Sequence, residues 1–387
     1  MAFKKAINSP IFSEISNYCS NNNIECYVVG GFVRDFFLNR ECKDVDILII
    51  GDGISAAKKI ANTIDPNISV TVFKNFGTAY FKYKEYEIEF VGSRKESYVS
   101  SSRNPTVQAG TLEDDINRRD FKINSIAISL NKHNYGELVD LHDGLSDINQ
   151  KIINTPLDSN ITFSDDPLRM LRAIRFSCQL DFEIHPELIN TMTKLKERIS
   201  IITSERIIDE INKIILTKTP SEGFKILEKT GLLKLIIPEL TNLKGIDEIE
   251  GQKHKDNFYH TLEVLDNICL NTNNLWLRWA ALLHDIGKAP TKKFNKKIGW
   301  TFHGHEFEGS KMVYKLFKRL KMPLNDKMKY VQKLVLMSSR PIVLAQENVT
   351  DSAVRRLIFD AGEAVDDLMT LCEADITTKN KNRFKKY

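Results

Sequence analysis

Apolar and polar residues between positions 26 and 141 follow the short periods of β-strands. CYVV at 26–29 and DVDILII at 44–50 are apolar runs typical of buried strands, and a glycine pair and the helix-like VRDFFL separate them. SVTVF at 69–73 and YFKYKEYEIEFV at 80–91 are rich in β-forming residues, and the second run alternates as a half-exposed strand does. ELVDL at 137–141 is a last strand candidate. The pattern predicts an N-terminal unit built on a mixed β-sheet.

Beyond residue 163 the apolar residues repeat at helical spacing. The segments PLRMLRAIRFSCQL, ERIIDEINKIIL and LWLRWAALLHDIG, which begin at residues 167, 205 and 275, are typical examples. A chain of 387 residues is too long for one hydrophobic core. We therefore expect an α+β protein with a β-sheet head at 1–150, a helical neck and body at 151–245, and a second helical domain at 246–387.

Composition narrows the class of protein. Hydrophobic residues make up 42% of the chain and charged residues 27%, which is typical of a soluble globular protein. No apolar run reaches the roughly 20 residues of a membrane-spanning helix, and the first residues lack a secretory signal. The six cysteines are scattered, so we expect reduced thiols, a cytoplasmic location and no membrane partner. The net charge of +4 permits a polyanionic partner without requiring one, and the oligomeric state is left open.

The segment GGFVRDFFLNRECKDVD at 30–46 carries the strongest chemical signal. Asp44 and Asp46 stand two positions apart on a predicted strand, so both carboxylates leave the same face. A divalent ion would offset their repulsion, and Mg²⁺ favours carboxylate oxygens. Gly30 and Gly31 separate a strand from a helix, where backbone N–H groups can meet an anion. Arg34 follows on the first helical turn, where it can clamp a phosphate oxygen.

Each part of this segment also has a plainer interpretation. D-x-D at a strand start is often a solvated edge, and G-G is often only a turn. Together, at this spacing, they favour nucleotidyl transfer, in which metal ions neutralise the transferring group and activate the attacking 3′ hydroxyl. Glu89, on the strand EIEFV, is either a third carboxylate of the site or an outward-facing strand residue.

The same residues carry a family resemblance. VVGGFVRDFFLNRECKDVDILI resembles the signature of the class II tRNA nucleotidyltransferase and poly(A) polymerase family. The resemblance implies that Asp44 and Asp46 are catalytic and bind the metal, expected as two Mg²⁺ ions. It also implies nucleotide binding by the glycine pair and the residues that follow, for which we take Gly30, Gly31, Arg34 and Asp35.

A second segment, RRDFKINSIAISL at 118–130, resembles the family's triphosphate and ribose segment. The implied nucleotide-binding residues are Arg118, Arg119, Asp120 and Asn124. The last two are four positions apart and can share a helical face. Lys122 stands where threonine is usual in the family. The plainer interpretation is a charged helix start ahead of an apolar run.

A third segment, SDDPLRMLRAIRF at 164–176, resembles the family's E-D-x-x-R segment, with Asp165 in place of glutamate. On a helix, Asp166 and Arg169 can face one ligand and match the hydrogen-bonding edge of a base. The resemblance implies that this pair selects C or A, while Arg172 and Arg175 add phosphate or base contacts. The alternative is that the second aspartate only caps the helix before a proline.

The C-terminal half contains a histidine cluster. HTLEVLDN, LLHDIGK, FHGHEFEGS and LCEADI resemble an HD-type domain, whose His and Asp residues bind metals and hydrolyse phosphoesters. Adjacent His and Asp side chains supply two ligands for a divalent ion. His303 lies in these motifs, and Ser338 stands where relatives often carry histidine, which leaves open a weaker or merely structural site. The candidate second metal site comprises His260, His284, Asp285, His305 and Asp375.

The resemblance implies a tRNA nucleotidyltransferase that adds C, C and A to a tRNA 3′ end from CTP and ATP, without a nucleic-acid template, and releases pyrophosphate. Its partners would be tRNA, CTP and ATP. Between residues 94 and 118 the family has a mobile loop that switches the pocket from C to A. Arg103 fits this loop, whereas Ser101 replaces an expected aspartate. The alternatives are a poly(A) polymerase of the same family, an HD-type phosphohydrolase acting on RNA ends, and a pure RNA-binding module.

Overall fold

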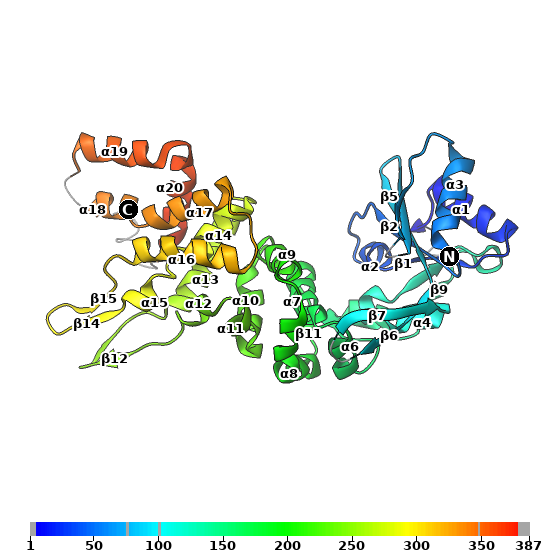
Figure 1. Cartoon of the computed structure of the whole chain (residues 1–387), viewed down its shortest axis with the longest axis horizontal. Coiled ribbons are helices and arrows are strands. Elements are labelled where there is room, and N and C mark those ends of the chain that lie inside the picture. The colour runs from blue at the N-terminus through cyan, green and yellow to red at the C-terminus, as the bar shows by residue number, and fades with distance from the viewer. Residues whose placement is uncertain (1–4, 75–76, 100–101, 347–348, 378–387) are drawn as a thin grey trace. The chain divides into compact units, whose positions relative to one another are not determined.

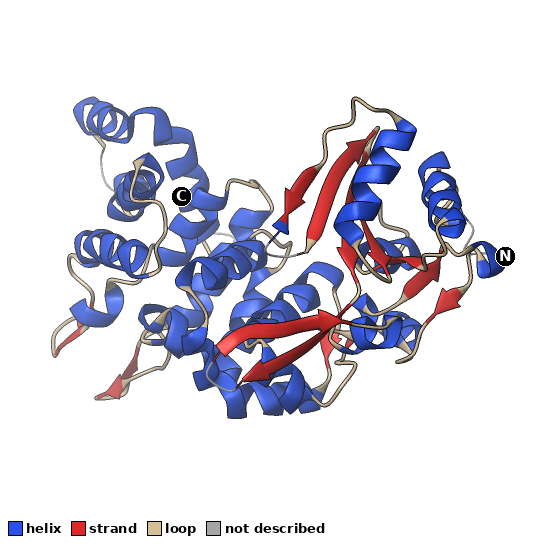
Figure 2. Ribbon diagram, turned by 45° about the vertical axis from the view of Figure 1, so that its right-hand side comes forward, coloured by secondary structure: helices blue, strands red, loops and turns tan. Residues whose placement is uncertain are grey.

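The computed structural model describes residues 5–74, 77–99, 102–346 and 349–377, and it divides into two compact units. The first unit comprises Met1–Arg169 and Phe182–Thr191, and the second comprises Met170–Asp181 and Met192–Tyr387. The large sheet belongs to the first unit, whereas the second is mainly helical (Figures 1 and 2). The predicted α+β class is confirmed. The predicted domain boundaries at 150 and 245 stay predictions.

The first unit is built on a seven-stranded sheet in the order β3-β4-β5-β2-β1-β8-β9. Its central strand β2 pairs antiparallel with β1 and parallel with β5, so the sheet is mixed. Ile47, Leu48 and Ile49 of β2 are fully buried, as the apolar run predicts. The strands are β1 Cys26–Val29, β2 Asp44–Ile49, β3 Thr71–Phe73, β4 Thr78–Tyr83, β5 Tyr86–Gly92, β8 Ala127–Ser129 and β9 Leu138–Val139.

Helices and a separate hairpin complete this unit. Helix α3 packs against β4 and β5, and α1 packs against α3. A Cβ added at Gly53, the first residue of α3, would lie 2.8 Å from the backbone nitrogen of Gly92, so a larger residue would push the helix off β5. The elements are α1 Pro10–Asn21, α2 Gly31–Phe37, α3 Gly53–Ile64, β6 Arg94–Val99, β7 Ser102–Ala109, α4 Leu112–Asn117, α5 Gly144–Gln150, β10 Ile152–Ile153, α6 Ser159–Asp165 and β11 Glu183–Ile184.

Two strand predictions differ from the structure. The run at 80–91 was predicted as one strand, but β4 and β5 form a hairpin in which Tyr83 pairs with Tyr86. Lys84 takes a φ of 53° at the turn, and two polar residues there interrupt the apolar alternation. The β6–β7 hairpin was not predicted, because its sequence is largely polar.

The second unit is almost entirely helical. Helices α13 and α14 pack together, and α14 also packs against α17 and α20. Trp279 of α14 is fully buried, with its ring centroid 6.3 Å from that of Phe317 on α16. No described helix of the chain is long and apolar enough to cross a membrane.

The helices of the second unit are α9 Ser204–Ile215, α10 Pro220–Thr230, α11 Leu232–Ile236, α12 Pro238–Thr241, α13 Asn257–Cys269, α14 Leu275–Leu283, α15 Lys288–Thr291, α16 His305–Arg319, α17 Asp326–Met337, α18 Arg340–Gln346, α19 Asp351–Ala361 and α20 Val365–Asp375. Helices α7 Leu168–Leu180 and α8 Pro186–Leu195 belong in part to each unit. Two short hairpins, β12 Glu248–Ile249 with β13 Gln252–Lys253 and β14 Lys293–Asn295 with β15 Gly299–Thr301, belong to the second unit.

One buried arginine holds helix ends of the second unit together. Arg278 is 2% exposed, and its guanidinium donates to the carbonyl oxygens of Ile215 and Thr217 at 2.8 Å each. It also donates to the carbonyl oxygen of Thr272 at 2.8 and 2.9 Å. Helix C-termini leave carbonyl oxygens without intrahelical partners. The Arg278 side chain donates hydrogen bonds to such oxygens at and just after the ends of α9 and α13.

The substitution Arg278→Lys is expected to lower the free energy of unfolding by about 3 kcal/mol or more, because a lysine cannot reach all of these carbonyls and leaves some buried and unpaired. Urea unfolding measures the loss. The matched control is Arg340→Lys, an exposed side chain of the same unit that pairs with Asp360, where a change of less than about 1 kcal/mol is expected. Equal losses in both variants would contradict the role of Arg278.

Candidate active site

The turn between β1 and α2 brings backbone and charged side chains together. Gly30 has a φ of 76°, in the left-handed region. A Cβ added there would lie 3.0 Å from Asp46 Oδ2 and 3.3 Å from Arg119 Nη1. A side chain would therefore be strained and would press on both groups. Glycine at this position leaves the surroundings of the carboxylate open.

Three carboxylates lie on two neighbouring strands. Asp44 and Asp46 share one face of β2, where the first is exposed and the second half-buried. In the parallel pairing of β2 with β5, Asp46 lies opposite Glu89. Paired residues project to the same side of a sheet, so Glu89 joins the two aspartates. This register favours the third-carboxylate interpretation of Glu89 over an outward-facing strand residue.

The surroundings of Asp46 disfavour its ionised form. Burial is the main cause that raises the pKa of Asp46 to about 6; Arg119 opposes the rise, while Glu89 and Asp44 add to it. Hard divalent ions such as Mg²⁺ bind carboxylate oxygens, so this donor set fits such an ion. The residues that would hold it are Asp44 and Asp46, with Glu89 beside them.

A buried network holds Arg34 next to the glycine turn. Its Nε and Nη2 donate to the two carboxylate oxygens of Asp35 at 2.9 and 3.0 Å, and Nη1 donates to Asn124 Oδ1 at 2.8 Å. Asn124 Nδ2 in turn donates to Asp120 Oδ1 at 3.0 Å. The structure thus brings four of the predicted nucleotide-binding residues into one chain of hydrogen bonds. Asp35 and Asp120 orient their partners in this network.

The predicted helical face at 118–124 takes a different form. Lys122–Asn124 is a single 3₁₀ turn rather than an α-helix, and strand β8 follows it. Asp120 and Asn124 still meet through their side chains, because the turn is tight and Asp120 also accepts from the backbone N–H of Phe121.

Asp115 is a functional candidate that sequence reasoning missed. It is fully buried on α4, and its carboxylate pairs with both Arg118 and Arg119. Its Oδ2 lies 2.9 Å from Arg119 Nη2. The spacing of three and four residues before the two arginines is the signal that was available. One carboxylate therefore fixes two guanidinium groups, of which Arg119 lies beside Gly30.

The pair predicted to select the base does not lie on one helix. Asp166 precedes α7, and its Oδ1 accepts from the backbone N–H of Leu168 at 3.1 Å, as in the capping alternative. Arg169 lies in the first turn of α7, and its Nη2 donates to the carbonyl oxygen of Arg118 at 2.5 Å. This contact connects the third sequence segment directly to the second.

The other two predicted arginines belong to the second unit. Arg175 Nε donates to the buried Glu210 at 2.7 Å, and its guanidinium lies 4.1 Å from the ring centroid of Phe176. Arg172 lies 5.5 Å from the same centroid. Arg175 thus contributes to helix packing in its unit. Ser101 lies outside the described residues, as does the side chain of Arg103, so their predicted roles stay predictions.

A second cluster of ligand-type side chains lies in the second unit. His260 Nε2 is 2.9 Å from Asp375 Oδ1, and His284 Nε2 lies 3.4 Å from Asp285 Oδ2 and 3.5 Å from Asp375 Oδ1. His305 Nε2 is 3.6 Å from Asp285 Oδ1. The structure therefore brings together all five residues predicted for the second metal site.

The geometry of this His/Asp cluster fits a divalent ion. The Nδ1 atoms of His284 and His305 face the carbonyl oxygens of Ala281 and Phe302, which orients both Nε2 atoms toward Asp285. The buried Nε2 of His284 has no hydrogen-bond partner in the described chain. Ligand atoms of His260, His284 and Asp285 lie within 4.8 Å of one another.

The two carboxylates of the cluster favour the protonated form of His284. Burial lowers the pKa of His284, but Asp285 and Asp375 outweigh it and raise that pKa to about 10. Lys288 Nζ is 2.6 Å from Asp285 Oδ2, so an ammonium group also faces the cluster. Ser338 is buried, and its hydroxyl donates to the carbonyl oxygen of Val335. His303 is exposed and has no ion pair within the described ranges.

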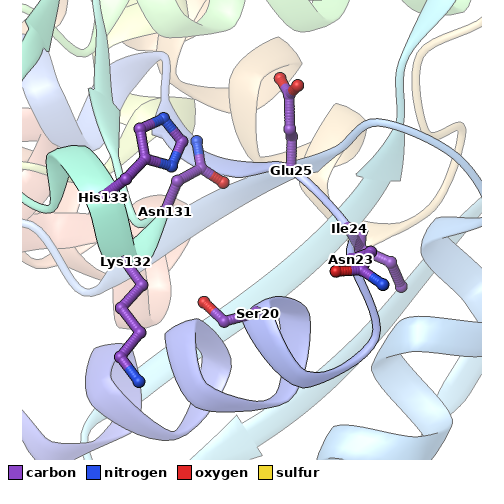
Figure 3. A pocket seen from close by; sticks show the side chains of 7 residues that line it. All are labelled: Ser20, Asn23, Ile24, Glu25, Asn131, Lys132 and His133. Carbon is purple, nitrogen blue, oxygen red and sulfur yellow. The ribbon is translucent and has the colours of Figure 1, made fainter.

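A cavity of about 560 Å³ lies elsewhere in the first unit. It opens at the Cys26 end of β1, whereas Gly30 follows the opposite end of that strand. Figure 3 shows its lining residues, which are Ser20, Asn23, Ile24, Glu25, Asn131, Lys132 and His133. None of the predicted site residues lines it, so this cavity is not the predicted nucleotide site.

Three family models match successive parts of the chain. Residues 26–154 match the poly A polymerase head domain, residues 181–244 match the probable RNA and SrmB-binding site of polymerase A, and residues 257–377 match the HD domain. The multifunctional CCA protein of Shewanella frigidimarina is 30% identical over 373 residues, covering 91% of this chain and 84% of that protein. This chain belongs to the tRNA nucleotidyltransferase and poly(A) polymerase family. Enzymes with this head and HD domains generally depend on divalent metal ions.

Two further relatives match this chain over different shares of their own length. The multifunctional CCA protein of Mannheimia succiniciproducens is 32% identical over 324 residues, covering 78% of this chain and 71% of that protein. The A-adding tRNA nucleotidyltransferase of Aquifex aeolicus is 28% identical over 376 residues; the match covers 89% of this chain but only 44% of that enzyme.

Solved structures share the fold of this family member. A tRNA nucleotidyltransferase complexed with a primer tRNA and an incoming ATP analog has a TM-score of 0.67 at 22% identity, with 96% of each chain covered. A CCA-adding enzyme in complex with ATP has a TM-score of 0.69 at 22% identity, covering 99% of this chain and 81% of that one.

The substitution Asp46→Asn is expected to stabilise the metal-free protein at pH 7.5 by about 1–2 kcal/mol. One pKa unit corresponds to about 1.4 kcal/mol, and partial exposure of the side chain reduces the effect. The folded pKa of about 6 lies above the ordinary value of 3.8, so the cost of ionising this acid grows between these values and is complete above pH 6.

Urea unfolding in EDTA measures this prediction. The stabilisation should be present at pH 7.5 and largely absent near pH 3, where both folded and unfolded aspartate are mostly protonated. Asp65→Asn, on an exposed residue after α3, is the control and should change stability little at either pH. A variant at Asp46 less stable than the wild type at pH 7.5 would contradict the prediction.

Proposed function

We propose that this protein adds C, C and A to the 3′ end of tRNA from CTP and ATP, without a nucleic-acid template, and releases pyrophosphate. The observation that carries the proposal is the gathering of Asp44, Asp46 and Glu89 beside the Gly30 turn and the Arg119 guanidinium. The similarity to multifunctional CCA proteins supports the choice of nucleotides and acceptor. All six cysteines are free thiols, which fits our placement of the reaction in the cytoplasm.

Each part of the first unit receives a role in this proposal. Asp44 and Asp46 are the catalytic residues that would hold Mg²⁺, which in bound form neutralises the triphosphate and activates the 3′ hydroxyl. We expect two ions. Nucleotide contacts come from the turn and the arginine network, namely Gly30, Gly31, Arg34, Asp35, Arg118, Arg119, Asp120 and Asn124. Asp115 holds the two arginines in place before the nucleotide arrives, which reduces the cost of ordering them.

We assign base selection to Asp166 and Arg169, whereas the phosphate or base contacts expected of Arg172 and Arg175 stay a prediction. A carboxylate that accepts and a guanidinium that donates can match the hydrogen-bonding edges of cytosine and adenine. The contact of Arg169 with the carbonyl oxygen of Arg118 supports this role, since it places the pair next to the proposed triphosphate segment. We place the head at 1–150, the neck and body at 151–245 and the HD-like domain at 246–387.

The His/Asp cluster supports a second activity, the hydrolysis of phosphoesters at RNA ends. Each of the three imidazoles there lies within 4 Å of at least one of the two carboxylates, as expected of a divalent-metal site. Because this cluster and the three carboxylates of the head use different residues, substitutions in one should leave the chemistry of the other intact.

The decisive assay incubates the protein with a tRNA that lacks its 3′ CCA and with CTP, ATP or both. Sequencing of the products should show CC with CTP alone and CCA with both nucleotides. Asp46→Asn should reduce the rate at least 1,000-fold, about 4 kcal/mol in transition-state stabilisation, whereas Asp65→Asn should retain the rate. Unlimited addition of A without C would establish a poly(A) polymerase, and A added only to tRNA ending in CC would establish an A-adding enzyme; either result contradicts the proposal.

The substitution Asp166→Ala is expected to lower the preference for the correct nucleotide by about 100-fold, because one partner of the base edge is lost. Competition between CTP and ATP at each position of the growing end measures this preference. Asp165→Ala removes the neighbouring carboxylate and is expected to keep the preference. If both variants discriminate as well as the wild type, Asp166 has no part in base selection.

A further inference from the structure

The hairpin β14–β15 carries an unusual concentration of positive charge. From Ile286 to Gly304 the chain contains five lysines and no aspartate or glutamate. Four of these lysines lie in or directly before the hairpin, which extends beside β12 and β13 in Figure 1. A solvated surface usually mixes both signs of charge, so a segment of one sign is typical of a surface that meets a polyanion.

Lys292 has a carboxylate partner, whereas the other lysines of the hairpin have none among the described residues. Lys292, at the base, pairs with Asp247 and lies 5.7 Å from the ring centroid of Trp300. In contrast, Lys293, Lys296 and Lys297 are exposed, and none has a carboxylate partner in the described chain. These three charges are therefore available to an external anion.

Aromatic packing makes the hairpin a defined platform. Phe294 and Trp300 are cross-strand partners with ring centroids 5.3 Å apart, and His254 packs on Trp300 at 5.1 Å. Trp300 Nε1 also donates to the carbonyl oxygen of Gln252 in the neighbouring hairpin. Because side chains alternate along a strand, Lys293 projects to the face opposite Phe294. The turn adds Ile298, which is 66% exposed.

The base of the hairpin is tied to the His/Asp cluster. Lys288 Nζ contacts Asp285 at 2.6 Å and lies 5.8 Å from the ring centroid of Phe302, directly after β15. The carbonyl oxygen of Phe302 faces His305 Nδ1 at 2.9 Å. The hairpin thus lies in the sequence between Asp285 and His305, two residues of the cluster, and the residues that flank it contact both of them.

We propose that the β14–β15 hairpin is an RNA-binding arm of the HD-like domain, in which Lys293, Lys296 and Lys297 hold the phosphate backbone of a single-stranded RNA beside the His/Asp cluster. Lysine ammonium groups are point charges that pair with phosphates without regard to sequence. The exposed isoleucine and the half-buried aromatic rings provide apolar surface for unpaired bases. The arm would therefore prefer a single strand and read no sequence.

The test measures binding of the full-length protein to a single-stranded RNA oligonucleotide at several salt concentrations. For single strands the logarithm of the association constant falls with the logarithm of salt by about 0.7 per phosphate contact. The triple variant K293Q/K296Q/K297Q should therefore reduce the magnitude of this slope by about 2. The control K315Q/K327Q/K329Q removes the same number of charges from exposed lysines on α16 and α17 of the same domain.

The control should change the slope by less than half as much as the arm variant. An unchanged slope in the arm variant would overturn the proposal, because its lysines would then make no phosphate contact. Equal changes in both variants would also overturn it, since only the overall charge of the domain would matter. Transfer of nucleotides to tRNA provides a separate readout, so failure of the arm does not depend on the proposed polymerising activity.

Discussion

The proposed site of the first unit depends on holding like charges together on two neighbouring inner strands of the sheet, β2 and β5. The parallel register of β2 and β5 sets Asp46 opposite Glu89, and the strand period sets Asp44 on the same face. Burial is the main cause of the raised pKa of Asp46, and its two carboxylate neighbours raise it further, so a bound cation would stabilise the ionised form. The surrounding sheet, with its fully buried apolar residues in β2, supplies the rigidity that keeps these carboxylates in place.

The arginines of the site are also held in place by neighbouring side chains. Arg118 and Arg119 share Asp115, whereas Arg34 is held by Asp35 and by an asparagine of the next segment. These partners hold the arginine side chains in their rotamers before a nucleotide binds. Binding therefore loses less conformational entropy than it would with free arginines. The glycine turn is the remaining element, since any side chain there would lie against the negative and positive groups alike.

Much of this could be predicted from the sequence, for identifiable reasons. The period of two on β2 predicts the shared face of Asp44 and Asp46, and the His and Asp residues of the C-terminal half occur in recognisable motifs. The spacing of Asp115 before two arginines was visible in the sequence, but the full burial that makes it their shared partner was not. The capping contact of Asp166 and the helix-packing role of Arg175 depend on which backbone and which helix lie nearby, which residue spacing alone does not determine.

The central claim is that the carboxylates of β2 form the polymerising metal site. Anomalous scattering from crystals grown with Mn²⁺ and a non-hydrolysable CTP analogue tests it most directly. We expect a manganese peak within about 2.5 Å of oxygens of both Asp44 and Asp46, with the triphosphate beside it. Manganese found only at the His/Asp cluster, with the triphosphate away from β2, would contradict it.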